Sequence, residues 1–208
     1  MKILELFAGS RSIGKVAEKI GCSVVSSDIE QFGDIDYVTD ILDFDYDKID
    51  FIPDVIWASP PCTGLSVASI GTHWGGGKNV YDPKTETARL GIRLVQKTLA
   101  IIEHYKALNP HLIYYIENPR GVLRKLHLLD DVPFHHTVSY CQYGDERMKP
   151  TDIWTNNSNW RPKKICKNGD SCHVAAPRGS KTGTQGRNGA FERSKIPEQL
   201  CFEVLESI

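Results

Sequence analysis

Short apolar runs alternate with longer amphipathic segments from Met1 to about Thr155, and this alternation limits the possible folds more than any other feature of the sequence. The apolar runs have the length of buried strands, and the segments between them are long enough for helices. This order is typical of a parallel sheet with crossover helices. We therefore expect an α/β fold with helices on both faces of the sheet. The expected strands are KILELF, SVVSSD, YVTD, DVIWAS, LIYYIEN and HHTVSYC.

The clearest expected helix runs from Thr85 to Leu108. Apolar side chains recur in it at spacings of three and four residues, which predicts a stripe that faces the core. A shorter helix is expected at Ser12–Ile20, and a short turn at Leu123–Leu126. The closing segment IPEQLCFEVLESI has the same helical periodicity, so we expect it to pack back on the main domain.

The composition changes after Trp154. The segment that follows is rich in Asn, Lys, Arg, Gly and Pro and almost free of aliphatic side chains, which is typical of a loop. A chain of 208 residues has room for one well-buried domain with a small appendage. We expect a main domain at 1–155, a short basic loop-rich insert at 156–190, and a C-terminal helix within 191–208.

Charge and cysteine usage restrict the partners and the compartment. The formal net charge is -1, so a contact with nucleic acid has to rest on a local basic patch. Six cysteines are scattered along a chain that opens without a signal peptide, which favours a reducing compartment over a disulfide scaffold. No apolar run approaches the roughly 20 residues that cross a bilayer, so we expect no membrane partner.

The stretch ELFAGSRSIG places a strand before a glycine-containing turn and a helix. In open α/β sheets this first loop approaches a nucleotide-like cofactor. Asp28 ends the second expected strand, where a carboxylate accepts the hydroxyl protons of a ribose, and Asp40 ends the third, where it meets an adenine amino group. The alternative is that both acids are ordinary turn residues.

The stretch DVIWASPPCTGLS ends a buried strand with two prolines and Cys62. Pro60 and Pro61 fix φ and remove two backbone donors, so they hold the thiol in one place. Glu117 and Asn118 end the next strand. A thiol and a carboxyl group at neighbouring strand ends suit conjugate addition to an electron-poor ring, with the carboxyl group donating to a ring nitrogen. The alternative is a cysteine that only fills the core.

In order and spacing, FAGS, SPPCTGLS, IENPRG and YCQYGDERMKPTDIW resemble the motifs of the DNA (cytosine-5)-methyltransferases over residues 3–155. ERSKIPEQLCFEVL resembles the closing motif of compact members from phages and prophages. The resemblance implies a Rossmann-like S-adenosylmethionine-dependent methyltransferase sheet, and it implies methyl transfer to the 5-position of cytosine in duplex DNA. It also implies a flipped target base, because the base is out of reach inside the duplex. The expected location is the cytoplasm of a bacterium or of a phage-infected host cell.

The resemblance also implies roles for individual residues. Cys62 attacks the ring carbon beside the acceptor carbon, Glu117 protonates or hydrogen-bonds the ring nitrogen, and Asn118 positions the loop. The cofactor-binding residues implied by the family motifs are Phe7, Ala8, Gly9, Asp28, Ile29, Asp40, Ile41 and Pro60.

The sequence departs from the family pattern at two motifs. Arg11 stands where the family usually has a second glycine in the cofactor loop, and DERMKPT stands where it has two arginines spaced by one residue. Either Arg147 or Lys149 then serves the substrate carbonyl and phosphate. These departures leave open a non-catalytic nucleic-acid-binding module of the same fold. A methyltransferase of amino groups also has paired prolines, but it usually follows them with an aromatic residue where Cys62 stands.

The insert is too short for the large recognition domain of typical family members. Its basic side chains, Arg178, Lys181 and Arg187 among them, are expected to lie along phosphates; the alternative is a solvated loop without a partner. One branch of the family acts on transfer RNA, so RNA is the alternative substrate to DNA. The sequence leaves a dimer open.

Three metal-binding side chains, Cys166, Cys172 and His173, fall within eight residues of the insert. We expect a structural zinc ion there, with Cys141 available as a fourth ligand, because zinc would stabilise a segment that has almost no core. The spacing fits no standard zinc finger, and a reduced loop without metal is the alternative.

Overall fold

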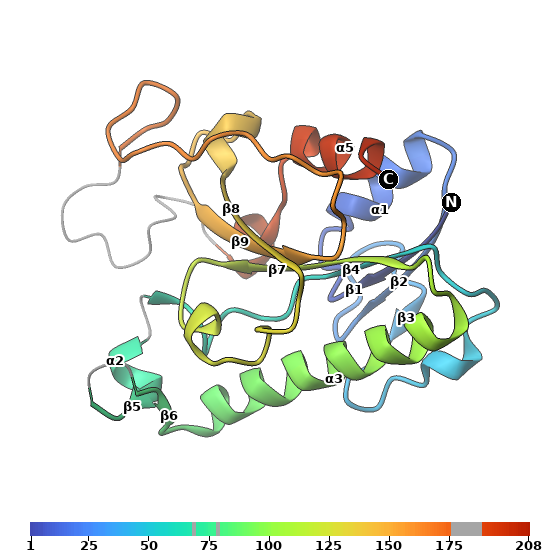
Figure 1. The fold of residues 1–208 in the computed structure, drawn as a ribbon, viewed down its shortest axis with the longest axis horizontal. Helices are drawn as coiled ribbons and strands as arrows, with labels where there is room; N and C mark the ends of the chain where they lie inside the picture. The colour runs from blue at the N-terminus through green and yellow to red at the C-terminus, as the bar shows by residue number, and fades with distance from the viewer. Residues whose placement is uncertain (68–69, 78–79, 176–188) are drawn as a thin grey trace.

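The computed structural model describes residues 1–67, 70–77, 80–175 and 189–208. Within these ranges the chain forms a central sheet with helices on both faces, and a small hairpin stands apart from it (Figure 1). The sheet strands are β1 (Lys2–Leu6), β2 (Ser23–Asp28), β3 (Tyr37–Val38), β4 (Val55–Ala58), β7 (Ile113–Pro119), β8 (Phe134–Ser139) and β9 (Pro150–Thr155), and the hairpin is β5 (Trp74–Gly75) with β6 (Asp82–Pro83). The helices are α1 (Ser12–Lys19), α2 (Ile70–His73), α3 (Glu86–Leu108), α4 (Ala190–Ser194) and α5 (Glu198–Glu206), with 3-10 turns η1 (Tyr46–Lys48), η3 (Leu123–Lys125) and η4 (Tyr140–Tyr143).

The strand order of the sheet is β3-β2-β1-β4-β7-β9-β8. The first five strands of this order run parallel, whereas β9 is antiparallel to both β7 and β8. The sheet is therefore mostly parallel, as the expected fold class requires, but its antiparallel strand β9 was not predicted. Its sequence PTDIWT begins with proline and buries Thr151 and Asp152, so its composition resembles that of a loop.

Helices cover both faces, as the sequence predicted (Figure 1). On one face, α3 packs its buried stripe, including Ala88, Val95 and Ile102, against the sheet. The side chain of Thr85 accepts the N–H of Ala88, which makes Thr85 the N-cap and starts the helix one residue later than expected. On the other face, α1 and α5 lie side by side over Trp57 and other aromatic residues of the sheet.

The order in which strands are added to the sheet reverses between β1 and β4. From β1 the chain proceeds outward through β2 and β3, and then returns to the other side of β1 to form β4 and β7. The loops that leave β1 and β4 therefore diverge, and a crevice opens at the carboxyl ends of these strands. The two loops singled out in the sequence, the glycine-containing loop after β1 and the Pro-Cys loop after β4, border this crevice.

The insert and the C-terminal helix are attached to the main domain by polar contacts. Residues 156–175 of the insert contain no helix or strand, and the insert is described again only at its end, where α4 begins. Asn157 donates to the Tyr115 hydroxyl at 2.7 Å and to Ser207 Oγ at 2.9 Å, and Glu203 accepts from the Tyr143 hydroxyl and from Trp160 Nε1. These bonds tie the start of the insert and α5 to η4 and β7.

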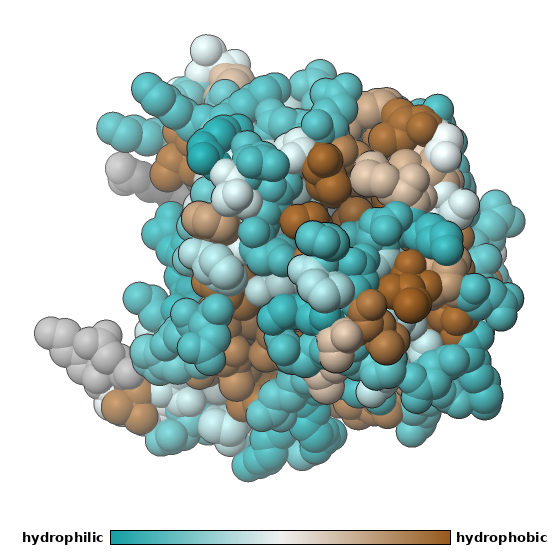
Figure 2. All heavy atoms as spheres, turned by 45° about the vertical axis from the view of Figure 1, so that its right-hand side comes forward, coloured by the Kyte–Doolittle hydropathy of each residue, from teal (hydrophilic) through white to brown (hydrophobic). Residues whose placement is uncertain are grey.

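Most of the face shown in Figure 2 is hydrophilic, with hydrophobic side chains gathered in small patches. Within the described ranges, every helix is too short or too polar to pass through a lipid bilayer. All six cysteines are free thiols.

A buried ion pair joins β9 to η3. Arg124 donates to both carboxylate oxygens of Asp152, at 2.9 and 2.6 Å, and Thr137 donates to the same carboxylate at 2.8 Å. Burial raises the pKa of Asp152, but hydrogen bonds from His135, Thr137 and Arg124 outweigh this effect, so the pKa lies below its ordinary value. This network supplies the partners that a carboxylate needs in the middle of a sheet.

We predict that Arg124→Ala lowers the free energy of unfolding at pH 7 by roughly 2–4 kcal/mol, because it leaves the carboxylate of Asp152 buried without its main partner. The folded pKa of Asp152 lies below the unfolded value of about 3.9. The stabilisation is therefore complete above that pH and disappears as the pH falls through the folded pKa. Urea unfolding at several pH values measures both effects. Arg120→Ala, at an exposed side chain, is the control; equal losses for the two variants would contradict the prediction.

Candidate active site

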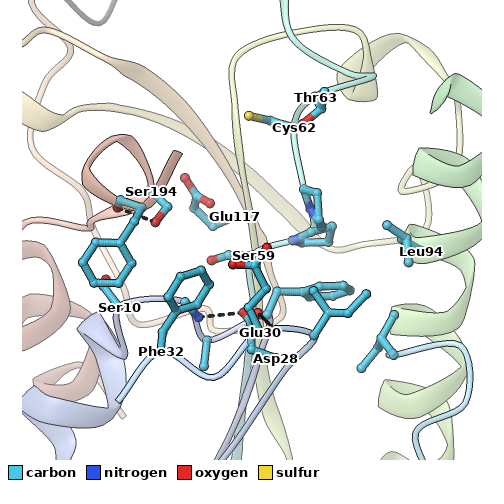
Figure 3. Close-up of a pocket in the computed structure, with 18 of the residues that line it drawn as sticks. Ser10, Asp28, Glu30, Phe32, Ser59, Cys62, Thr63, Leu94, Glu117 and Ser194 are labelled. Carbon is cyan, nitrogen blue, oxygen red and sulfur yellow. Dashed lines mark hydrogen bonds between the residues drawn. The ribbon is translucent and has the colours of Figure 1, made fainter. Parts of the chain in front are cut away.

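A pocket of about 640 Å³ opens at the carboxyl ends of β1, β2, β4 and β7. This volume falls in the usual range for small-molecule sites. Figure 3 shows Cys62 and Glu117 toward one end of the pocket and Asp28 and Phe32 toward the other. The structure brings every predicted cofactor residue to the wall, namely Phe7, Ala8, Gly9, Asp28, Ile29, Asp40, Ile41 and Pro60.

The loop between β1 and α1 is fixed by a buried carboxylate. Glu5 accepts the backbone N–H groups of Ile13 and Gly14 at 3.1 and 3.0 Å, so it satisfies donors at the start of α1. Burial raises the pKa of Glu5 to about 7, and the two N–H bonds and Arg11 oppose the rise. A Cβ on Gly14 would lie 2.6 Å from the carboxylate, so a larger residue here would displace the group that holds the loop.

Arg11, which replaces the second glycine of the family motif, has a φ of 54°. This is the left-handed region that favours glycine, which gives a physical reason for the family's residue. The guanidinium of Arg11 is buried and forms an ion pair with Glu18 of α1. The side chain therefore points back to the helix, and it does not line the pocket.

The side chains of Asp28 and Asp40 accept hydrogen bonds from backbone N–H groups, and both residues also line the pocket. Asp28 accepts the N–H of Gly9 at 2.8 Å and that of Glu30 at 3.0 Å, and Asp40 accepts the N–H of Leu42 at 2.9 Å. Both acids therefore stabilise turns, as the alternative interpretation expected, and both also form part of the pocket wall. Beside them, the buried hydroxyl of Ser27 has no hydrogen-bond partner and also lines the pocket. An unpaired buried hydroxyl here fits a polar ligand.

The loop that carries Cys62 is held through its carbonyl groups. Asn118 donates to the carbonyl of Pro60 at 2.8 Å, and the N–H of Val122 donates to the carbonyl of Leu65 at 2.7 Å. The carbonyl of Cys62 accepts two N–H groups from the turn that follows, each at 2.9 Å. Asn118 therefore lies behind the loop, in the position expected of a residue that orients it.

Glu117 is a buried carboxyl group that faces the same pocket as Cys62 (Figure 3). The hydroxyl of Tyr140 donates to it at 2.9 Å. Burial raises the pKa of Glu117, and the nearby charge of Lys149 partly opposes the rise. A raised pKa favours the protonated form that donates a proton to a substrate.

The structure separates the two basic residues that the sequence left as alternatives. Lys149 lines the pocket, donates to the carbonyl of Arg193 at 2.9 Å and lies 4.4 Å from the centre of the Tyr140 ring. Arg147 is buried away from the pocket and forms a two-bond ion pair with Asp145 at 2.9 and 2.7 Å. Of the two, Lys149 has the position to meet a substrate.

Burial raises the pKa of the Cys62 thiol, and the carboxylate charge of Glu117 raises it further. Lys149 and Arg193 act in the opposite direction. The thiolate, which is the nucleophilic form, therefore depends on these two positive charges.

Part of the pocket wall comes from the end of the chain, which sequence reasoning assigned only to packing. Phe191, Arg193 and Ser194 line the pocket, and the ring of Phe191 lies 5.1 Å from that of Phe32. No local signal marks these residues, because their contacts span most of the sequence.

The predicted metal ligands also lie together. The ligand atoms of Cys141, Cys166, Cys172 and His173 are all within 4.8 Å of one another. The predicted phosphate-contacting residues Arg178, Lys181 and Arg187 lie outside the described residues.

A doubly wound sheet with a ligand pocket at its switch point, and with a cysteine and a buried carboxyl group on the pocket wall, defines an α/β protein of the nucleotide-binding type with a nucleophile and an acid in its pocket. One curated relative is more specific. The "Probable DNA (cytosine-5)-methyltransferase" of Frog virus 3 (isolate Goorha) is 32% identical over an alignment of 226 positions, which covers 99% of this chain and 99% of the viral protein. The chain therefore belongs to the DNA (cytosine-5)-methyltransferase family. The predicted family and class of enzyme are confirmed, and a viral relative fits the expected compact type.

Other comparisons add less. No family model matches the chain. The solved structures it resembles include the Entamoeba histolytica methyltransferase EhMeth, at 13% identity and a TM-score of 0.49 over 82% of this chain, and a Spodoptera frugiperda DNMT2 mutant, at 19% identity and 0.47 over 84%. The chain spans 57% of each of those proteins. The family assignment rests on the viral relative.

We predict that Lys149→Met raises the pKa of the Cys62 thiol. Of the two positive charges that lower this pKa, that of Lys149 has the larger effect, and the substitution removes it. Iodoacetamide alkylation of Cys62, followed by peptide mass spectrometry across a pH series, should become slower at a given pH below the new pKa. Lys106→Met, at an exposed lysine, controls for the loss of charge elsewhere. An unchanged or faster reaction of Cys62 in Lys149→Met would show that the electrostatic assignment is wrong.

Proposed function

We propose that the chain transfers a methyl group from S-adenosylmethionine to the 5-position of cytosine in DNA through a covalent adduct with Cys62. The observation that carries the proposal is that Cys62 and Glu117 share one pocket with the cofactor residues implied by the family motifs. A non-catalytic module has no need of a thiol and a buried carboxyl group in the same pocket.

The pocket fits S-adenosylmethionine in size and in its polar groups. Asp28 has the position for the ribose hydroxyls, Asp40 and Ile41 for the adenine, and Phe7 and Gly9 for the methionine part. When bound, the cofactor supplies an electrophilic methyl group. The residues of this chain hold the cofactor and exclude water from the pocket.

The chain's own part in the reaction begins at Cys62. Its thiolate forms a bond to the ring carbon next to the acceptor carbon, while the protonated Glu117 donates to the ring nitrogen. The acceptor carbon thereby gains electron density and takes the methyl group. The proton at that carbon is then lost to solvent, and the Cys62 thiolate departs. The ring nitrogen returns its proton to Glu117, and the aromatic ring is restored.

Two further residues support this chemistry. Lys149 lowers the pKa of the thiol and lies where a substrate carbonyl would enter, so we propose it rather than Arg147 as the substrate-contacting basic residue. Asn118 keeps the loop of Cys62 in place through the carbonyl of Pro60.

The finer proposals concern partners and parts of the chain. We propose duplex DNA with a flipped cytosine as substrate and an intracellular location. We propose that 1–155 binds cofactor and base, that 156–190 contacts phosphates through Arg178, Lys181 and Arg187, and that 191–208 closes the pocket. A zinc ion at the Cys/His cluster is the second group that we propose for this chain.

We predict that Asp28→Ala weakens binding of S-adenosylhomocysteine about 10–100-fold, because hydrogen bonds to a charged group contribute about 1.5–3 kcal/mol. Titration calorimetry measures the affinity. Asp50→Ala, at an exposed carboxylate outside the pocket, should bind like the wild type. Equal affinity of the two variants would exclude Asp28 from the cofactor site.

Transfer of tritium from labelled S-adenosylmethionine to duplex DNA, followed by nucleoside analysis, tests the activity. We expect 5-methylcytosine with the wild type, none with Cys62→Ala, and a rate about 10²–10⁴-fold lower with Glu117→Gln. Cys22→Ser serves as the matched control, since Cys22 lies outside the pocket.

Duplex DNA with 5-fluorocytosine separates the covalent route from the others. The fluorine blocks release of the adduct, so a protein–DNA complex that survives denaturation should form with the wild type and not with Cys62→Ala. Label in RNA and not in DNA would overturn the choice of substrate, and wild-type methylation by Cys62→Ala would overturn the mechanism.

A further inference from the structure

We propose that Cys141, Cys166, Cys172 and His173 form a Cys₃His structural zinc site that fastens residues 161–174, here called the strap, to the η4 turn of the main domain. The inference specifies the zinc of the proposed function, and it does not depend on methyl transfer.

The four ligand atoms lie close enough together to bind one tetrahedral ion, and the two nearest sulfur atoms would have to move apart slightly around it. Cys141 Sγ lies 3.0 Å from Cys166 Sγ and 3.5 Å from Cys172 Sγ, and His173 Nδ1 lies 3.8 and 3.5 Å from the sulfur atoms of Cys166 and Cys172. Zinc–sulfur bonds of about 2.3 Å place neighbouring sulfur atoms about 3.8 Å apart in a tetrahedron. Three thiols and an imidazole nitrogen are a common ligand set for structural zinc.

The ligands come from two separate parts of the fold. Cys141 belongs to η4, directly after β8, and is buried, whereas the other three ligands belong to the strap. An ion bound here would therefore cross-link the strap to the main domain. This role differs from that of a zinc finger, whose ligands fold a single short segment around the metal.

The burial pattern of the strap favours a metal over an apolar core. Ile165 and Val174 are 55% and 67% exposed, while Cys166 and His173 are half-buried and face the cluster. A segment that exposes these apolar side chains and half-buries a cysteine and a histidine instead needs order from a source other than hydrophobic burial.

Backbone hydrogen bonds already hold the strap along η4. The N–H of Lys163 donates to the Tyr143 hydroxyl at 2.9 Å, that of Cys166 to Ser139 Oγ at 3.2 Å, and that of Val174 to the carbonyl of Glu146 at 3.0 Å. The last of these contacts reaches the segment that leads to Lys149. The zinc site thus lies at the centre of the contacts that join the insert to the active-site side of the domain.

A disulfide between Cys141 and Cys166 is the competing arrangement. It would need a sulfur–sulfur bond of about 2.05 Å and would leave Cys172 and His173 without a role, although both lie in reach of the same point. The metal explains all four side chains, and the disulfide explains two.

The test is the metal content of the full chain, purified without chelator in the presence of a reductant and then incubated with zinc. We expect about one zinc ion per chain by native mass spectrometry, and its loss in Cys166→Ser and Cys172→Ser. Cys172 is exposed, so its substitution leaves the core intact. Cys22→Ser, outside the cluster, should keep the ion.

Trypsin provides a second readout, because Lys163, Lys164 and Lys167 lie in the strap. Cleavage at these lysines should become several-fold faster in Cys172→Ser, or in the wild type with a zinc chelator, and should stay unchanged in Cys22→Ser. Absence of bound zinc in the reduced wild type, retention of zinc in Cys166→Ser and Cys172→Ser, or the mass of a disulfide would each overturn the inference. Neither assay contains DNA or methyl donor, so failure of the proposed activity would leave its result unaffected.

Discussion

The position of Cys62 depends on hydrogen bonds that β7 and the turn after it donate to the carbonyl groups of its loop. Pro60 and Pro61 have no N–H, so the loop is held mainly as an acceptor. Asn118 supplies the bond to Pro60, and Val122 supplies the bond to Leu65. Since Glu117 precedes Asn118 in β7, the strand that anchors the thiol loop also carries the carboxyl group, and the two reactive groups share one rigid frame.

Within that frame, buried charge adjusts reactivity. Burial raises the pKa of Glu117 and lowers that of Lys149, so it favours the neutral form of both groups, while their mutual attraction favours the charged forms. The charge of each group therefore favours the charged form of the other. Lys149 has a φ of 27°, a strained value for a residue other than glycine, and its ammonium group is held by the carbonyl of Arg193 and the ring of Tyr140. Strain of this kind persists where the surroundings fix the residue in place. Through Arg193, the segment that closes the pocket also sets the position of the charge beside the thiol.

The sequence predicted which residues meet in the pocket where their position follows from the ends of parallel strands. The acids at strand ends and the Pro-Cys loop reach one pocket because parallel strands align their carboxyl ends, and a strand end is visible in a local pattern. Two features were out of reach because they depend on contacts between distant segments: the strand β9 and the pocket wall at Phe191. The choice between Lys149 and Arg147 was out of reach for a different reason. Arg147 pairs with Asp145, only two residues away, and the sequence does not show that this local ion pair is preferred to a place in the pocket.

The insert presents a separate physical problem. Residues 156–175 of the insert form no helix or strand, and Trp160 is their one buried apolar side chain. This segment gains little from hydrophobic burial, so its order has to come from polar contacts or from a bound group. The ligand set explains why the cysteine spacing matches no zinc finger: Cys141 lies 31 positions before Cys172, and a site assembled from two distant elements is not limited to the short spacings of a single folded unit. Closing a loop of that length removes more conformational freedom from the unfolded chain than a short finger does. A metal at this point would therefore order the short insert in the way that a hydrophobic core orders a full recognition domain, and it would need only four side chains as ligands.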